Sequence, residues 1–117
     1  MNREVYRICE RKNGELFTLF HGIKGSRKMP MNEWLTADVK IVKDGSKKTS
    51  KLYKSGFHTI ESLDECRTFT KKFKAKRDLV IVKCLIGENT WGKEHSPSNI
   101  ILTDRIKLLE IVENITI

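Results

Sequence analysis

Long apolar runs are missing from this chain. The longest, LVIVKCLIG, has nine residues and is interrupted by Lys83, whereas a membrane-spanning helix needs about 20 apolar residues. The N-terminal stretch MNREVYRICERKNGE is charged throughout and has no apolar core typical of a secretory signal. We therefore expect no membrane association and a cytoplasmic location.

Cysteine pairs at metal-binding or redox spacing are also missing. Cys9, Cys66 and Cys84 are odd in number and lie singly among apolar neighbours, which is typical of reduced, buried cysteines in a cytosolic protein. Histidines are equally scattered, and no short-spaced His, Cys or carboxylate cluster exists in the sequence. No nucleophile-elbow pattern is present. We predict no catalytic residue, no metal and no cofactor.

Acidic residues are scarce relative to basic ones. The 117 residues include 23 Lys and Arg against 15 Asp and Glu, a net charge of +8 with a pI near 9.5. For so small a chain this bias favours a polyanionic partner such as nucleic acid, a nucleoprotein or a nucleotide. The alternative is an ordinary protein with many surface lysines. No composition break marks a linker, so residues 1–117 are expected to form a single domain.

The N-terminal third predicts a β-hairpin followed by a loop. Val5–Glu10 alternates and Glu15–Phe20 is rich in β-formers, and the intervening Asn13-Gly14 is the strongest short signal for a type I′ turn. The stretch HGIKGSRKMP indicates a loop, and the region around Trp34 a short strand or turn. A further strand is expected over Asp38–Lys43, followed by a polar stretch.

One amphipathic helix is predicted after an extended Tyr53–Ile60, which is broken at Ser55-Gly56. Ser62 and Glu65 have the spacing of a capping box. An apolar stripe follows, and the helix is expected to end near Lys74; the stripe consists of Leu63, Cys66, Phe69 and Phe73.

The C-terminal part predicts strands. Leu79–Ile86 is a continuous β-branched run typical of a strand buried on both faces, and GENTWGKEHSPSN indicates a long loop. Ile100–Leu102 is expected to be a strand. For Ile106–Val112 we prefer a strand, although its composition also fits a helix. The predicted fold class is α+β, a mostly antiparallel sheet of about six strands with one main amphipathic helix.

Basic residues gather in two stretches of the sequence. Residues 24–56 hold nine cations and three acids, and residues 67–77 hold six cations and no acid. If the outer face of the helix and the lysine-rich loop lie side by side, they form one positive surface that attracts phosphates. The alternative is a solvated helix face and a solvated loop. The predicted nucleic-acid contacts are Arg27, Lys28, Trp34, Lys47, Lys48, Lys51, Lys71, Lys72, Lys74 and Arg77.

A second hypothesis places an anion or nucleotide pocket, or the site of an enzyme, at Ser26, His58 and His95, with Arg27 beside them. GIKGSRK has the glycines, hydroxyl and cations of an anion loop but does not match the phosphate-loop pattern. His58 precedes a helix N-terminus, where it is able to help hold a phosphate or carboxylate. The simpler interpretation is a half-buried histidine in a strand-to-helix joint.

A third hypothesis is a protein–protein inhibitor that acts through exposed loops. Trp34 and Trp91 lie in loop-like contexts, where they either anchor a partner or stack on a base, or else cap the ends of the core. The C-terminal ENITI is able to pair with the edge of a second copy, which leaves a homo-oligomer open.

Four stretches of the chain, FHGIKGSR, EWLTA, SGFHTIESLDE and KEHSPSNIILTDRI, resemble small uncharacterised proteins of phages and prophages. The resemblance implies a short, basic protein used in the host cell cytoplasm during infection, with inhibition of a host defence as its function. GFH before a capped helix also resembles ligand-binding loops of ADP-ribosyltransferase-type folds. That family's Tyr and Glu positions have no counterpart here, so the activity is not transferred.

Overall fold

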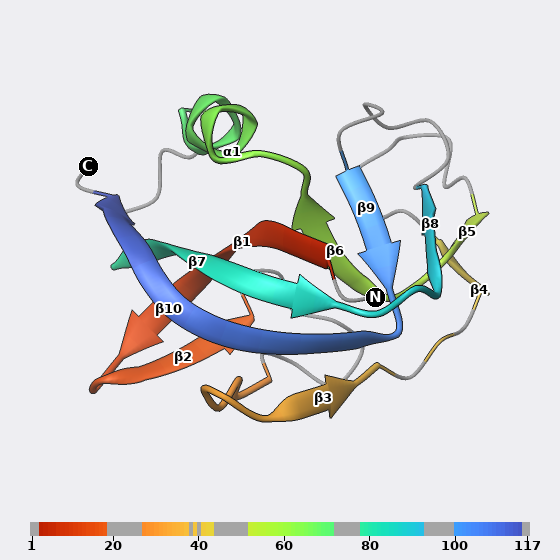
Figure 1. Cartoon of the computed structure of the whole chain (residues 1–117), viewed down its shortest axis with the longest axis horizontal. Coiled ribbons are helices and arrows are strands. Elements are labelled where there is room, and N and C mark those ends of the chain that lie inside the picture. Colours follow the sequence, from red (N-terminus) through yellow and green to blue (C-terminus); the bar gives the residue numbers. More distant parts are fainter. Residues whose placement is uncertain are drawn as a thin grey trace.

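The computed structural model describes residues 3–18, 27–37, 39, 41–43, 52–71, 78–92 and 100–115. Eight strands form one sheet in the order β3-β10-β7-β1-β6-β9-β8, with β2 also paired to β1, and β4 and β5 form a separate two-stranded sheet (Figure 1). In chain order the elements are β1 Arg3–Lys12, β2 Glu15–Thr18, β3 Trp34–Thr36, β4 Ile41–Lys43, β5 Leu52–Lys54, β6 Phe57–Ile60, α1 Leu63–Thr70, β7 Leu79–Ile86, β8 Thr90–Gly92, β9 Ile100–Thr103 and β10 Arg105–Ile115.

The predicted N-terminal hairpin is confirmed. β1 and β2 pair antiparallel from Cys9↔Thr18 to Lys12↔Glu15. Asn13 and Gly14 have φ angles of 52° and 78°, the positive values that a type I′ turn requires at both central positions. The turn residues therefore fix the register of this hairpin.

The predicted α+β class is wrong, because this is a mostly-β fold. The described residues form ten strands and a single helix of eight residues. Several segments too short to show an alternating hydrophobic pattern nevertheless pair as strands. One of them is β8, which lies in the segment expected to be a loop. Ile106–Val112 lies in the long strand β10, as preferred from its sequence. None of the described helical residues forms a segment long and apolar enough to cross a membrane.

The inner face of the curved sheet holds the larger part of the core. Alternate residues of β1, β7 and β10 are fully buried there, including Val5, Val82 and Leu108. Two register shifts between β10 and β7 bend β10 around this core (Figure 1). The segment 27–36 then bonds to strands on both sides, since Met29 N donates to Leu16 O at 2.7 Å and Asn32 N to Leu108 O at 2.8 Å. It therefore lies between β2 and β10.

The outer face is covered by α1 over part of its length. Ser62 caps the helix by accepting a hydrogen bond from Glu65 N at 3.2 Å, which confirms the predicted start. Cys66 then packs on Ile8 and Ile81 in a second buried cluster. The helix ends at Thr70 with Lys71 as its C-cap, about one turn before the predicted end. The predicted stripe residue Phe73 lies outside the described residues.

Candidate functional site

Most of the predicted nucleic-acid contacts cannot be placed in the fold. Arg27, Lys28, Trp34 and Lys71 are described, as is His58 of the predicted pocket. The other predicted residues lie outside the described residues: Ser26, Lys47, Lys48, Lys51, Lys72, Lys74, Arg77 and His95.

The described members of the predicted basic surface do not lie together. Arg27 and Lys28 lie beside β2, Trp34 lies on the edge strand β3, and Lys71 caps α1, which Figure 1 shows at the opposite side of the view from β3. The elements on either side of the two lysine-rich stretches are also separated in space. Residues 72–77 connect α1 to β7, and residues 44–51 connect β4 to β5. Figure 1 shows the end of α1 and the start of β7 on the left, and β4 and β5 at the right edge. The anchoring elements therefore give no support to one continuous surface.

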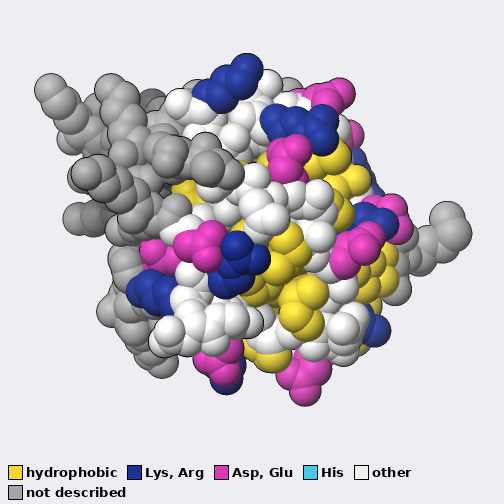
Figure 2. Space-filling view, turned by 90° about the vertical axis from the view of Figure 1, so that its left-hand side faces the viewer, with side chains coloured by type: hydrophobic (Ala, Val, Ile, Leu, Met, Phe, Trp, Pro, Cys, Tyr) yellow, Lys and Arg dark blue, Asp and Glu magenta, His cyan; other side chains and the backbone are white. Residues whose placement is uncertain are grey.

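Net charge is divided unevenly along the sequence. We call the residues that the structure describes the framework, and it carries little of the net charge. The described residues include thirteen Lys and Arg against twelve Asp and Glu, and Figure 2 shows both signs interspersed at the end of the molecule that it faces. The remaining residues contribute +7 of the net +8, with only three acids among them. Their cations are Lys24, Lys40, Lys47, Lys48, Lys51, Lys72, Lys74, Lys76, Arg77 and Lys93.

Within the part of the chain that the structure describes, several cations lie on aromatic rings and not beside carboxylates. Arg27 Cζ is 5.4 Å from the centroid of the Phe57 ring, and its Nη1 donates to Thr36 O at 2.9 Å. Arg105 Cζ is 4.7 Å from the Trp34 ring. By contrast, Lys28 forms an ion pair with Glu15 at 2.8 Å. Because no carboxylate of the described residues pairs with Arg27 or Arg105, the charge of each guanidinium on its ring is available to a ligand.

The β3–β10 pair presents a basic and aromatic strip on the outer side of the sheet. Trp34 faces Lys107 across the two strands, and Thr36 faces Arg105. Ile106 and Leu35 between them point into the core, so alternation places their neighbours outside. Lys107 is in turn opposite Leu85 of β7. We call this surface the Trp34 strip, and it comprises Trp34, Thr36, Leu85, Arg105 and Lys107.

Sequence reasoning found Trp34 but missed Arg105 and Lys107. Their signal was the alternation of Arg105, Ile106, Lys107 and Leu108 in a segment expected to be a strand. The partner strand could not be inferred, because β3 lies about 70 residues earlier in the chain and pairing at that separation leaves no local trace. The strip becomes visible only once β3 is placed on β10.

Trp91 has a structural role. It is half-buried, its Nε1 donates to Lys54 O at 3.0 Å, and Lys54 Nζ lies 4.2 Å from its ring centroid. A Cβ on Gly56 would come within 2.9 Å of the Trp91 ring and 2.8 Å of Thr103 O. Glycine is therefore needed where β5 leads into β6, and the indole holds this joint together.

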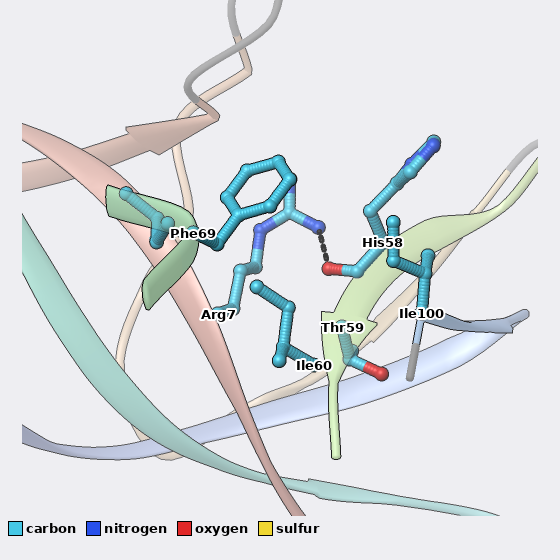
Figure 3. Close-up of a pocket in the computed structure, with 7 residues that line it drawn as sticks. Arg7, His58, Thr59, Ile60, Phe69 and Ile100 are labelled. Carbon is cyan, nitrogen blue, oxygen red and sulfur yellow. Dashed lines mark hydrogen bonds between the residues drawn. The ribbon is translucent and has the colours of Figure 1, made fainter. Parts of the chain in front are cut away.

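His58 lines the rim of a small pocket beside α1. Its ring points away from the guanidinium of Arg7, while its carbonyl oxygen accepts a hydrogen bond from Arg7 Nη1 at 2.9 Å (Figure 3). The pocket encloses about 50 Å³, far below the roughly 300–1,000 Å³ of sites for drug-sized ligands. It is too small for a nucleotide. This Arg7 pocket is lined by Arg7, Ile8, His58, Thr59, Ile60, Phe69 and Ile100.

The three thiols are placed for packing. Cys9, Cys66 and Cys84 are all free and buried, as expected from the sequence. Burial raises the pKa of the Cys66 thiol to about 12 and raises the pKa of the other two as well. Such thiols are weak nucleophiles at neutral pH. Within the described ranges, no group of His, Cys, Asp and Glu is arranged to hold a metal ion.

Comparisons of this chain with family models, with curated proteins and with solved structures gave no match.

Proposed function

We propose that this protein binds nucleic acid, or a host complex that contains nucleic acid, without catalysing a reaction. The observation that carries the proposal is the distribution of charge. The lysine-rich stretches outside the described framework hold +7 of the net +8. Basic segments of this kind attract phosphates over a distance and make affinity strongly dependent on salt.

The Trp34 strip supplies a second type of contact. Trp34 is half-buried, so part of its ring surface remains open to a nucleobase. Arg105 lies against that ring and Lys107 lies opposite Trp34 on the neighbouring strand. Aromatic and basic residues on a sheet surface bind single strands, because every base has a face to stack and every nucleotide a phosphate. The proposed ligand is therefore single-stranded DNA or RNA.

The cellular context is part of the same proposal. The resemblance of the sequence to small phage proteins implies a role during infection, and three buried, free cysteines fit a reducing cytoplasm. Occupying the nucleic acid of a host defence complex would inhibit that complex by blocking its own contacts. Pull-down from host lysate with and without nuclease distinguishes this from direct protein binding, which would survive nuclease.

Binding of a labelled single-stranded oligonucleotide across a salt series tests the proposal. We expect log Kd to rise with log salt at a slope of roughly 0.7 for each phosphate neutralised. Replacing Lys47, Lys48 and Lys51 by Gln should reduce this slope. Trp34→Ala should weaken binding by roughly tenfold, the effect of one lost base stack.

The matched control replaces two framework cations that already have carboxylate partners. Arg3 pairs with Glu61 and Arg11 with Asp78, each at 2.8 Å. The double variant R3Q/R11Q should bind almost as well as the parent protein. Absence of binding at low salt, or an affinity that salt does not change, would overturn the proposal.

A further inference from the structure

Arg7 is half-buried and has no carboxylate partner among the residues that the structure describes. Its Nη1 donates to His58 O, and its Nε is buried with no hydrogen-bond partner within the same described ranges. Among the described arginines, Arg3, Arg11 and Arg67 form ion pairs, and Arg27 and Arg105 are exposed. A half-buried charge without a counter-charge is costly. An anion from outside would remove that cost.

The local topology explains why Arg7 is held open to a ligand. One edge of β1 is shared by two strands, with β6 pairing at Tyr6↔Ile60 and β2 pairing from Cys9↔Thr18. Arg7 and Ile8 lie where these two neighbours part. The guanidinium enters this gap beside the Phe69 ring (Figure 3), and its Cζ is 5.7 Å from the Phe57 ring centroid. Strand separation, rings and the His58 carbonyl together fix its position.

The walls of the Arg7 pocket are mainly aliphatic and aromatic, from Ile8, Ile60, Phe69 and Ile100. The hydroxyl of Thr59 is already used, since it donates to Ile101 O at 2.7 Å. We infer that the Arg7 pocket binds a carboxylate on a short aliphatic stem. A carboxylate matches the planar donors of a guanidinium, and the stem contacts the apolar walls.

Size and polarity select this ligand over a phosphate. A pocket of about 50 Å³ admits a carboxylate and a few carbon atoms. A phosphate dianion would press strongly hydrated oxygens against Ile60 and Phe69, which offer no hydrogen bonds. The ligand is a free short-chain acid or the side chain of an acidic residue, two sources with the same chemistry. The inference is independent of nucleic-acid binding, because Arg7 is not part of the Trp34 strip.

Amide NMR titration with sodium propionate tests the inference. We expect saturable shifts at residues 8, 60 and 100, with a Kd on the order of millimolar for so few ligand atoms. Sodium chloride and inorganic phosphate at equal ionic strength should not reproduce them. A capped glutamate tested in parallel identifies the source: binding like propionate indicates an acidic side chain, and tenfold weaker binding a free acid.

Three variants separate the pocket from general charge effects. Arg7→Met should weaken propionate binding at least tenfold, and Ile100→Phe should do so by filling the pocket while keeping the guanidinium. Arg105→Met, the matched loss of an arginine, should leave propionate binding unchanged but weaken oligonucleotide binding. Unsaturable shifts, equal shifts with phosphate, or unchanged binding in Ile100→Phe would overturn the inference. None of these results bears on the oligonucleotide assay, so the two proposals fail separately.

Discussion

The two halves of strand β7 cross the same sheet in different surroundings. From Leu79 to Val82 every side chain is buried, whereas from Lys83 to Ile86 half-buried and buried side chains alternate. The first half has the inner core on one side and α1 on the other. The second half has the same inner core, but its outer side chains Lys83 and Leu85 remain partly open to solvent. The difference marks where the helix stops covering the sheet.

This comparison separates a structural region from a region available to ligands. Under α1 the outer face carries Ile8 and Ile81, which have no polar atoms and are excluded from water. Beyond the helix, the same face carries Lys83, Leu85 and Lys107, which are only partly buried. Burial contributes stability in the first region. In the second region, side chains contribute less to folding; Lys83 is paired with Glu110 at 3.0 Å, and the proposed recognition uses Leu85 and Lys107.

The largest expected effect contrasts one residue from each half. Ile81→Ala removes a fully buried side chain from the cluster under α1, and large-to-small changes at such sites cost about 2–5 kcal/mol of unfolding free energy. Leu85→Ala, on the same face of the same strand but partly exposed, should cost roughly 1 kcal/mol or less. Denaturant unfolding at neutral pH measures both.

Equal losses in these two variants would remove the distinction between the halves. Oligonucleotide affinity provides the reciprocal measurement, since Leu85 is part of the Trp34 strip and Ile81 is not. Ile81→Ala should leave the affinity of the folded protein unchanged. A weaker affinity in Ile81→Ala under conditions where it is fully folded would contradict the separation of roles.

The pH dependence of stability should differ between the parent protein and a variant that lacks the thiol under the helix. The pKa of Cys66 is raised to about 12, chiefly by burial, so the unfolded chain releases this proton at lower pH than the folded one. The stabilising contribution is complete below pH 9 and is lost as the pH rises from 9 towards 12. One such thiol gives a slope of about 1.4 kcal/mol per pH unit.

Cys66→Ala and Cys66→Ser both remove this proton, so both should lose stability less steeply than the parent above pH 9. Unfolding free energies at pH 8, 9, 10 and 11 provide the comparison. Cys9 and Cys84 also have raised pKa values, so some alkaline sensitivity should remain. Parallel curves for parent and variants would show that the Cys66 thiol ionises in the folded protein.

Local sequence signals predicted the elements that are stabilised locally. Asn13-Gly14 placed the hairpin and Ser62 with Glu65 placed the start of the helix, because each depends on residues close in sequence. The fold class was missed because short strands such as β3 and β8 are stabilised by partners far along the chain. Three residues are too few to show a hydrophobic period.

The candidate sites also depend on contacts between residues that are distant in the sequence, which local signals do not predict. Trp34 was recognised as an aromatic residue in a polar context, but its neighbour Arg105 follows only from the pairing of β3 with β10. Arg7 looked like an ordinary polar residue of an alternating strand. Its position in the gap between β6 and β2 depends on two separate pairings along one edge of β1. A sequence pattern carries no record of either arrangement.

The smallest expected effect concerns the helix cap that holds α1 over the first half of β7. Ser62→Ala removes the acceptor for Glu65 N and should cost about 1 kcal/mol. Thr68→Ala in the same helix is the matched control, because Thr68 is exposed and its hydroxyl donates to Asp64 O of the same helix at 3.1 Å. Alanine favours helices, so this control should be neutral or slightly stabilising.

Amide hydrogen exchange gives a second test of the same cap. If α1 excludes water from Ile8 and Ile81, S62A should speed amide exchange in α1 more than in the strands beyond the helix. Uniform acceleration across the sheet would instead mean that the helix and the sheet open only together, and the boundary on β7 would then be one of exposure and not of local stability.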